Sequence, residues 1–182
     1  MKKFFSLALF LALGCSPAVF AAKDPVVGGS PMSPQKNIVE NAAQSADHTT
    51  LVSAVKAAGL VETLEGPGPF TVFAPTNEAF QKLPAGTVDT LVKPENKEML
   101  TKILTYHVLP GRYTAAKLKG EIVAGGGSAM LKTVNGETLT ATMDGNDIVL
   151  KDGKGGMAHV TIANVMQSNG VIHVIDSVLL PN

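Results

Sequence analysis

The chain has 182 residues, of which 45% are hydrophobic and 16% charged, and this hydrophobic content excludes an intrinsically disordered protein. Fifteen Lys and Arg residues balance fifteen Asp and Glu residues, so the chain lacks the basic surface typical of nucleic-acid binding. A single cysteine excludes a disulfide framework and a zinc site built on several cysteines. The 18 glycines and 11 prolines, with many Val, Thr and Ile residues, favour strands joined by tight turns.

Residues 1–21 have the charge and hydropathy pattern of a secretory signal peptide. Lys2 and Lys3 form the positively charged start, residues 4–14 are apolar, and Val19 and Ala21 suit the small-residue pockets of a signal peptidase. The apolar stretch is too short for a transmembrane helix, which needs about 20 residues. We predict cleavage after Ala21 and a periplasmic or extracellular protein, and no later stretch predicts a membrane span.

A second interpretation of the leader is a lipoprotein signal. Residues 11–15, LALGC, resemble a lipobox, although Ala12 stands where leucine is usual. Lipid attachment would then occur at Cys15. Both interpretations place the mature chain outside the cytoplasm.

The rest of the chain divides into a spacer and one domain. Residues 22–36 are rich in Pro, Gly and Ser, which predicts a flexible spacer. Residues 37–182 are enough for one domain with its own hydrophobic core.

The first part of this domain has helical periodicity. The pattern predicts helical structure over residues 37–58, interrupted at Asp47 or Thr49 and ended by Gly59. Residues 70–74 predict a short buried strand, and Thr76 is placed to cap the helix that follows.

The clearest helix spans residues 94–107. Its apolar face carries Met99, Leu100, Ile103, Leu104 and His107. A further helical turn is predicted between Thr114, as its cap, and Gly120, as its end.

From residue 122 the pattern changes to a period of two, which is typical of strands. Strands are predicted at 129–134, 137–143, 147–151, 158–165 and 171–179. Asn135-Gly136 predicts a type I′ hairpin between the first two strands. Helices followed by an antiparallel meander indicate an α+β fold, with the apolar segment 171–175 as a central strand.

Motif searches by residue type and spacing predict no enzyme. The sequence contains no nucleophile elbow, no His-Glu-x-x-His motif and no Walker loop. The run Gly125–Ser128 lacks dinucleotide-binding spacing and predicts a loop. We therefore predict no catalytic residue, no metal site and no cofactor.

The four histidines are the remaining candidates for chemistry. The pattern places His48 and His159 in solvent, and His107 and His173 on apolar faces. A zinc site from His107, His173 and Asp176 is disfavoured, because residues three apart on a strand point to opposite faces. We therefore predict that His107 and His173 are buried, neutral and hydrogen-bonded.

Three segments resemble the signatures of the fasciclin (FAS1) domain family. Residues 70–80, FTVFAPTNEAF, resemble the first signature, and residues 169–181, NGVIHVIDSVLLP, resemble the second. Tyr106 and His107 resemble the Tyr-His motif that lies between them. The resemblance covers residues 35–182 and indicates a secreted, single-domain bacterial member.

This resemblance implies a fold and a class of function. The fold is a wedge-shaped sandwich of two small β-sheets with a helical layer. The family is not known for enzymes, and its members mostly mediate adhesion to cells, matrix or surface polymers. Some relatives bind small apolar ligands, including carotenoids.

The resemblance also suggests roles for single residues. Gly170 is expected to supply a positive φ before the last strand, and Tyr106 is the candidate for partner contact. The other signature residues are expected to be mainly structural: Thr71, Phe73, Ala74, Pro75, Thr76, Asn77, Phe80, His107, His173 and Asp176.

Two hypotheses for function follow. The first is a surface interaction module, a monomer or weak oligomer, that binds an unidentified protein or polysaccharide of the cell surface or matrix. The second is a carrier of a small apolar ligand such as a carotenoid. The carrier predicts an apolar pocket lined by several methionines from a set of five: Met99, Met130, Met143, Met157 and Met166.

Overall fold

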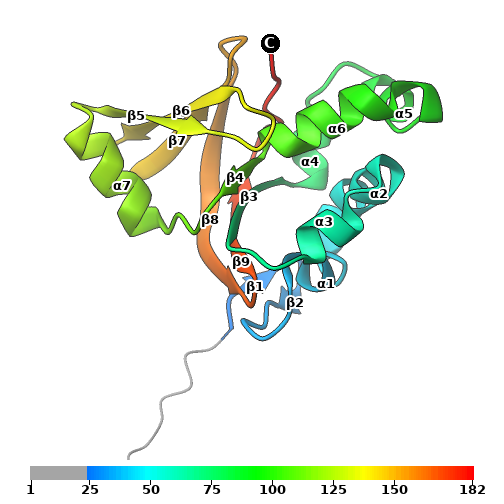
Figure 1. Ribbon diagram of the computed structural model, residues 1–182, viewed down its shortest axis with the longest axis horizontal. Helices are drawn as coiled ribbons and strands as arrows, with labels where there is room; N and C mark the ends of the chain where they lie inside the picture. The colour runs from blue at the N-terminus through cyan, green and yellow to red at the C-terminus, as the bar shows by residue number, and fades with distance from the viewer. Residues whose placement is uncertain (1–23) are drawn as a thin grey trace, which may run out of the picture.

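The computed structural model describes residues 24–182, so the predicted signal peptide, the lipobox and Cys15 lie outside the described residues. The chain combines short helices with one large sheet and a small hairpin (Figure 1). The α+β fold class is confirmed. None of the helices in residues 24–182 has the length and apolar character that a membrane span requires.

Seven strands form one continuous sheet in the order β4-β3-β9-β8-β7-β6-β5. All neighbours are antiparallel except β3 and β9, which are parallel. The strands are β3 (Phe70–Pro75), β4 (Val108–Pro110), β5 (Ser128–Lys132), β6 (Thr138–Asp144), β7 (Asp147–Lys151), β8 (Met157–Gln167) and β9 (Gly170–Ile175).

Strand β8 divides this sheet into two halves. Its register against β9 shifts twice, between Val160 and Ile162 and between Ile162 and Val165. Such bulges bend a strand and increase its twist, and Figure 1 shows β5, β6 and β7 running across the direction of β3 and β9. The two halves face each other as the wedge-shaped sandwich that the family resemblance implied.

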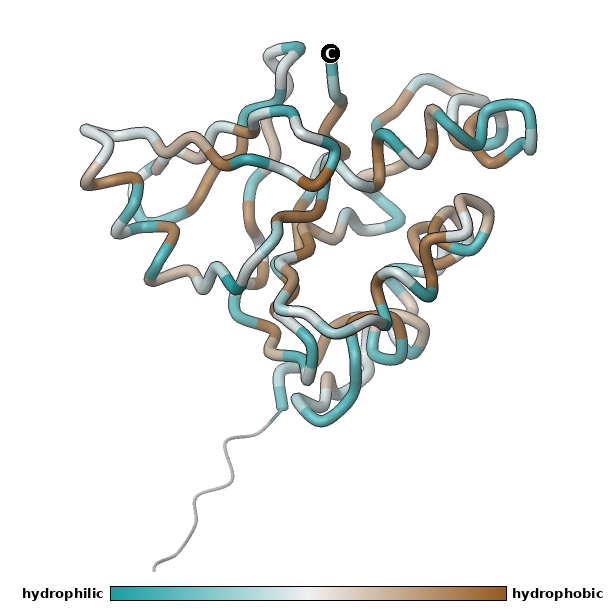
Figure 2. Tube along the Cα trace, in the orientation of Figure 1, coloured by the Kyte–Doolittle hydropathy of each residue, from teal (hydrophilic) through white to brown (hydrophobic). Residues whose placement is uncertain are grey.

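The space between the two halves holds one hydrophobic cluster. Phe73, Leu109 and Ile175 from one half pack in the same cluster as Leu139 and Leu150 from the other. Helix α7 (Ala115–Ala124) adds apolar side chains to this cluster and lies against β5 and β6. In Figure 2 the hydrophobic segments follow these central strands, and hydrophilic segments occupy many of the outer turns.

The helical layer builds a second cluster on the opposite face of β3 and β9. Val72 and Ile172 of these strands pack in the same cluster as Leu51, Val55 and Leu104 of the helices. Because β9 is buried along its whole length, its predicted central position is confirmed. The helices are α1 (Ile38–Ala42), η1 (Ala46–His48), α2 (Thr49–Ala58), α3 (Val61–Glu65), α4 (Asn77–Gln81), α5 (Thr87–Leu91), η2 (Pro94–Asn96) and α6 (Lys97–Tyr106).

Several helix boundaries follow from single residues, as predicted. Thr76 accepts a hydrogen bond from the backbone of Ala79, and Thr114 accepts one from Lys117. Gly59 ends α2 in the left-handed conformation with φ 72°. Helix α7, however, continues past Gly120 to Ala124, because one glycine lowers helix stability by only about 1 kcal/mol.

The structure differs from two other local predictions. Met99 lies at the margin of the apolar face of α6 and is 58% exposed. The Asn135-Gly136 connection is longer than a two-residue hairpin, because Thr133 pairs with Glu137 and only Gly136 has a positive φ. The side-chain oxygen of Asn135 instead accepts a hydrogen bond from the backbone N–H of Glu137, which stabilises the loop.

The structure also differs from the flexible spacer expected over residues 22–36. From residue 24 this segment packs on the domain, with a hairpin of β1 (Val26–Val27) and β2 (Ser30–Pro31). Val27 is 3% exposed and Met32 is 2% exposed, and both belong to the helical cluster. The composition predicted a spacer because Pro, Gly and Ser dominate the segment. The burial of Val27 and Met32 stabilises its packed conformation despite these turn-forming residues.

Candidate functional site

The three signature segments meet at the centre of the molecule. Strand β3 and strand β9 run in parallel, and Phe73 is paired with His173 across them. The Tyr-His motif ends α6, and the backbone N–H of Phe73 donates to the carbonyl of His107 at 2.9 Å. The three signature segments therefore pack against one another.

His107 is buried at the junction of three segments. Its Nδ1 lies 2.8 Å from the carbonyl oxygen of Ile103, and its Nε2 accepts the backbone N–H of Leu179 at 3.0 Å. A carbonyl only accepts and an amide only donates, so Nδ1 carries the proton of a neutral ring. Burial lowers the pKa of His107 to about 4. The ring is therefore buried and hydrogen-bonded, as the periodicity predicted, and its structural role stays a prediction.

His173 is satisfied in the same way with the opposite tautomer. Its Nε2 donates to the carbonyl of Tyr113 at 2.7 Å, and its Nδ1 accepts the N–H of Asn164 at 3.4 Å. Its ring is tilted by 31° against that of Phe73 at a centroid distance of 5.7 Å. Burial lowers the pKa of His173, so this ring also stays neutral.

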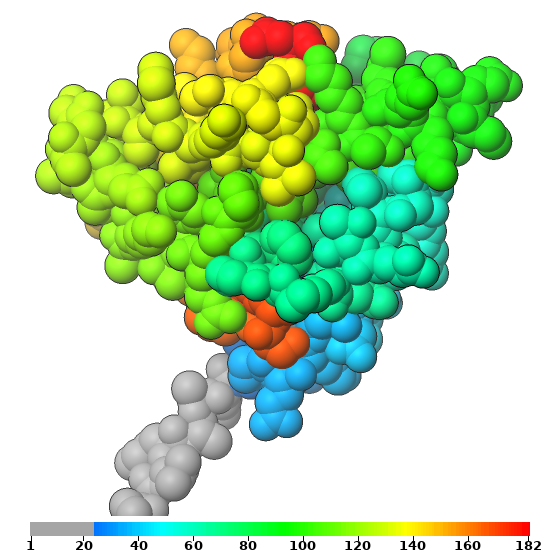
Figure 3. Space-filling view, in the orientation of Figure 1, coloured from blue at the N-terminus to red at the C-terminus, as the bar shows by residue number. Residues whose placement is uncertain are grey.

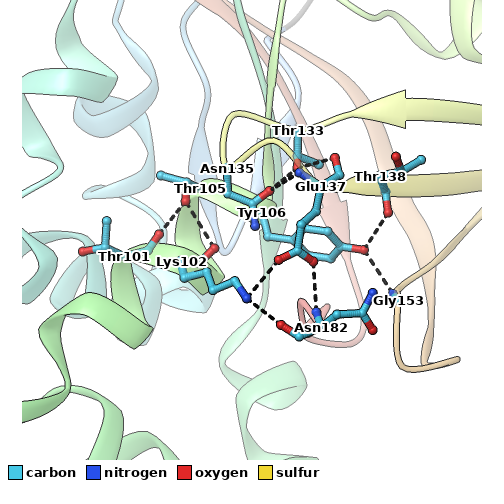
Figure 4. A network of polar contacts seen from close by, with 10 residues as sticks. All are labelled: Thr101, Lys102, Thr105, Tyr106, Thr133, Asn135, Glu137, Thr138, Gly153 and Asn182. Atoms are coloured by element: carbon cyan, nitrogen blue, oxygen red, sulfur yellow. Dashed lines mark hydrogen bonds and ion pairs between the residues drawn. The ribbon is translucent and has the colours of Figure 1, made fainter.

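Tyr106 is not the exposed contact residue that was predicted. Its side chain is fully buried between α6 and the sheet half that contains β6. The hydroxyl donates to the carbonyl of Thr138 at 3.1 Å and accepts the N–H of Gly153 at 3.1 Å (Figure 4). The prediction was wrong because the sheet half with Thr138 and the turn with Gly153 pack over Tyr106, and the helix pattern does not reveal this contact.

A second group of polar contacts lies beside Tyr106 (Figure 4). Lys102 of α6 forms an ion pair with Glu137 at 3.0 Å, and Glu137 accepts the backbone N–H of Asn182 at 2.9 Å. The Asn182 amide is the first cause, and Lys102 the second, of a lowered pKa for Glu137. These bonds join the helical layer, the β5–β6 loop and the end of the chain.

Asn77 caps a helix, but not its own. Its Oδ1 accepts the N–H of Thr50 at 3.0 Å, at the start of α2, and its Nδ2 donates to the carbonyl of Ala46 at 2.9 Å. Thr76 alone caps α4 with its side chain. The two neighbouring residues thus fix two separate helices.

Thr71 joins β3 to the turn that follows β4. Its buried hydroxyl donates to the carbonyl of Gly111 at 2.7 Å and accepts the N–H of Tyr113 at 2.8 Å. The residue between those two positions is Arg112, which sequence analysis did not single out. The available signal was that Arg112 is the one arginine in the sequence.

Gly170 has a different role from the one predicted, because its φ is not positive. A Cβ at this position would lie 2.1 Å from the carbonyl oxygen of Phe70. Glycine is required by this close approach of β3 to β9, and not by a left-handed turn.

Asp176 and His173 project to different partners, as their spacing predicted. Asp176 accepts the N–H of His159 at 2.8 Å and forms an ion pair with Lys82 at 3.4 Å. Burial acts to raise the pKa of Asp176, but the His159 amide, Ser177 and Lys82 together lower it. Within residues 24–182, no cluster of three His, Cys, Asp or Glu side chains is placed to hold a metal ion.

The other candidates are placed as follows. His159 is exposed, as predicted. His48 is 3% exposed and was predicted wrongly, because the hairpin of residues 26–31 and β3 cover it. Its Nδ1 lies 2.8 Å from the Ser45 hydroxyl, and burial lowers its pKa. The remaining signature residues are buried: Ala74, Pro75 and Phe80.

An apolar cavity of about 30 Å³ lies between the helical layer and β3. Leu51, Val55, Leu64 and Val72 are among its lining residues, and His107 reaches its edge. None of the five methionines proposed to line a ligand pocket contributes to it. Met99, Met130 and Met157 are instead exposed on the surface.

Known proteins resemble this chain over most of its length. The fasciclin domain model matches residues 46–181. Protein sll1483 of Synechocystis is 50% identical over 161 residues, which is 87% of this chain and 81% of that protein. Immunogenic protein MPB70 of Mycobacterium bovis is 37% identical over 92% of this chain and 80% of its own length.

A solved structure shows the same fold. It is a FAS1 domain pair from the insect cell adhesion molecule Fasciclin I, with a TM-score of 0.70 at 21% identity. The match covers 80% of this chain and 51% of that chain. With the family model, the relatives and the fold in agreement, the chain belongs to the fasciclin domain family.

Proposed function

We propose that this protein is an exported interaction module that attaches to a protein or polysaccharide of the cell surface or matrix and catalyses no reaction. One observation carries this proposal. The polar groups of Thr71, Tyr106, His107 and His173 are buried and bonded to backbone partners of the same chain. These four side chains therefore offer neither a free nucleophile nor a free base, and a partner has to be bound on the outer surface.

The names of related proteins support an extracellular role. A cell surface glycolipoprotein of Mycobacterium bovis, MPB83, is 34% identical over 92% of this chain and 70% of its own length. The insect structure with the same fold belongs to a cell adhesion molecule. Export by the leader of residues 1–21 fits this role. Because MPB83 is named a glycolipoprotein, the relative also supports the alternative of lipid attachment at Cys15.

Mass spectrometry of the protein from its native host tests the export step. An N-terminus at Ala22 supports a cleaved secretory signal, and an acylated Cys15 supports the lipoprotein alternative. A soluble cytoplasmic protein that retains its leader would contradict both.

Adhesion is tested on coated beads, because one domain with one contact surface binds weakly and many copies add avidity. Beads that carry residues 22–182 are expected to attach to native cells or matrix, whereas beads with heat-unfolded protein are not. A screen of ester, glycoside and phosphate substrates is expected to give background rates. Turnover that disappears with His107→Ala or His173→Ala would contradict a non-catalytic function.

The carrier hypothesis has less support. Pockets for small organic ligands enclose about 300–1,000 Å³, and the apolar cavity beside His107 encloses about 30 Å³. A visible absorption band in protein purified from its native host would favour the carrier over the interaction module.

A further inference from the structure

A groove of about 320 Å³ lies at one end of the sheet, where three chain segments meet. Six residues line it: Pro67, Gly68, Pro69, Arg112, Ser168 and Asn169. In Figure 3 the β8–β9 turn, which carries Ser168 and Asn169, reaches the surface between segments from the first half and the middle of the chain. The groove thus combines a turn before β3, a turn after β4 and the turn before β9.

Hydrogen bonds fix the position of Arg112. The Thr71 hydroxyl bonds the residues on both sides of Arg112: it donates to the carbonyl of Gly111 and accepts the N–H of Tyr113. The N–H of Gly111 also donates to the carbonyl of Pro69 at 2.9 Å. The arginine backbone is therefore tied to both the buried strand and the opposite wall of the groove.

The remaining wall is equally well defined. The Asn169 side chain accepts the N–H of Ile38 at 3.1 Å and donates to the carbonyl of Leu64 at 2.7 Å. The Asn169 carbonyl accepts the N–H of Phe70 at 3.0 Å. It also approaches Gly68 so closely that a Cβ there would lie 1.9 Å from it. A groove held in this way is preorganised for a ligand.

The Arg112 guanidinium forms no ion pair within residues 24–182. No carboxylate oxygen of the described residues lies within 4.0 Å of the Arg112 guanidinium. Its Nη2 donates one long bond, 3.4 Å, to the carbonyl of Gln167. Among residues 24–182 the Ser168 hydroxyl forms no hydrogen bond, so it is a second polar group available to a ligand.

We propose that this groove binds an oxyanion, a carboxylate or a sulfate, carried by an acidic polysaccharide. This inference rests on the proposed surface function and names its partner. The planar guanidinium matches such an oxyanion with two parallel hydrogen bonds, and Ser168 can bond a sugar hydroxyl. The rings of Pro67 and Pro69 offer apolar surface to the C–H face of a sugar. An open groove also lets a long polymer pass through, where a closed pocket would not.

Retention of coated beads on immobilised polymers tests the proposal. Alginate presents carboxylates, dextran sulfate presents sulfates, dextran is the neutral control, and polyglutamate presents carboxylates on a peptide. Wild-type beads are expected to bind alginate or dextran sulfate, which identifies the oxyanion, and to ignore dextran. Arg112→Gln is expected to weaken this binding about tenfold or more, the effect of losing hydrogen bonds to a charged group.

Two variants separate the groove from general charge. Arg112→Lys keeps the positive charge but loses the planar guanidinium with its paired N–H donors. This variant is expected to retain only part of the wild-type binding. Lys151→Gln removes the same charge from an exposed strand position far along the sheet and is expected to bind like the wild type. Urea unfolding of each variant verifies that it is folded.

Three results would overturn the proposal: equal binding by Arg112→Gln, an equal loss in Lys151→Gln, or retention on polyglutamate as strong as on the polysaccharides. Failure of the proposed function looks different. Wild-type beads that attach to native matrix but to neither acidic polysaccharide would keep the adhesion function and reject the groove. Beads that attach to nothing would reject the adhesion function itself.

Discussion

The Nε2 atom of His107 accepts the backbone N–H of Leu179 at 3.0 Å, which joins the end of helix α6 to the last residues of the chain. The other ring nitrogen of His107 bonds the carbonyl of Ile103, one turn earlier in the same helix. Phe73 of β3 bonds the His107 carbonyl. One residue thus connects the helical layer, the central sheet and the C-terminal segment.

Replacing His107 by Ala is expected to lower the free energy of unfolding by about 2–4 kcal/mol, because the change leaves a cavity and unpaired polar groups. Urea unfolding measures this loss. The control is His159→Ala, which removes an exposed ring and should change stability by no more than about 0.5 kcal/mol. Equal midpoints for both variants would contradict the structural role of His107.

The stability of the protein is expected to fall as the pH decreases from about 6.5 to about 4. Folded His107 has a pKa of about 4, whereas an unfolded histidine titrates near 6.5. The unfolded chain therefore binds more protons in this window, and the stability is fully present above it. His107 alone would account for about 3 kcal/mol, and the lowered pKa values of His48 and His173 act in the same direction.

Urea unfolding at several pH values checks this dependence. The negative charge of Asp152 opposes the effect by favouring protonated His107, but burial is the larger cause. His107→Gln should flatten the slope between pH 6.5 and 4. A slope identical to that of the wild type would assign the pH dependence to other groups.

Tyr106→Phe is expected to reduce stability by about 1–3 kcal/mol, because the Thr138 carbonyl and the Gly153 amide lose a buried partner. Attachment of coated beads should not change. Tyr113→Phe is a matched control, since the Tyr113 hydroxyl bonds no residue in the described part of the chain. Lost attachment with unchanged stability would restore Tyr106 as a contact residue.

Gly170→Ala is expected to cost about 3 kcal/mol or more, since its Cβ would lie 2.1 Å from the Phe70 carbonyl in a tightly paired sheet. Gly120→Ala is the comparison. That position lies in helix α7 with no heavy atom within 4 Å of the new Cβ, so the change should add up to about 1 kcal/mol. Thermal melts of the two variants should move in opposite directions, and a shift of Gly170→Ala to higher temperature would refute the close approach.

Met32→Ala is expected to destabilise the domain by about 2–5 kcal/mol, because Met32 is 2% exposed in the helical cluster. Met99→Ala makes the same chemical change at a side chain that is 58% exposed. It should therefore have an effect within about 0.5 kcal/mol. Equal stabilities of the two variants would contradict the packing of residues 24–36 on the domain and support a flexible spacer.

Much of the fold follows from local sequence patterns. The period of two located β5 to β9, the caps at Thr76 and Thr114 started two helices, and the left-handed Gly59 ended another. These features depend on neighbours within a few residues, whose side-chain spacing and hydrogen bonds are visible in the sequence. The inward position of His107 followed from the same periodicity.

Other features were decided only by contacts between distant segments. The burial of Tyr106 depends on Thr138 and Gly153, and the need for Gly170 depends on the backbone of Phe70. The groove around Arg112 needs Thr71 to hold a turn about forty residues later in the chain. No period or propensity carries this information, because a hydrogen bond across the fold depends on where two segments pack and not on the residues beside them.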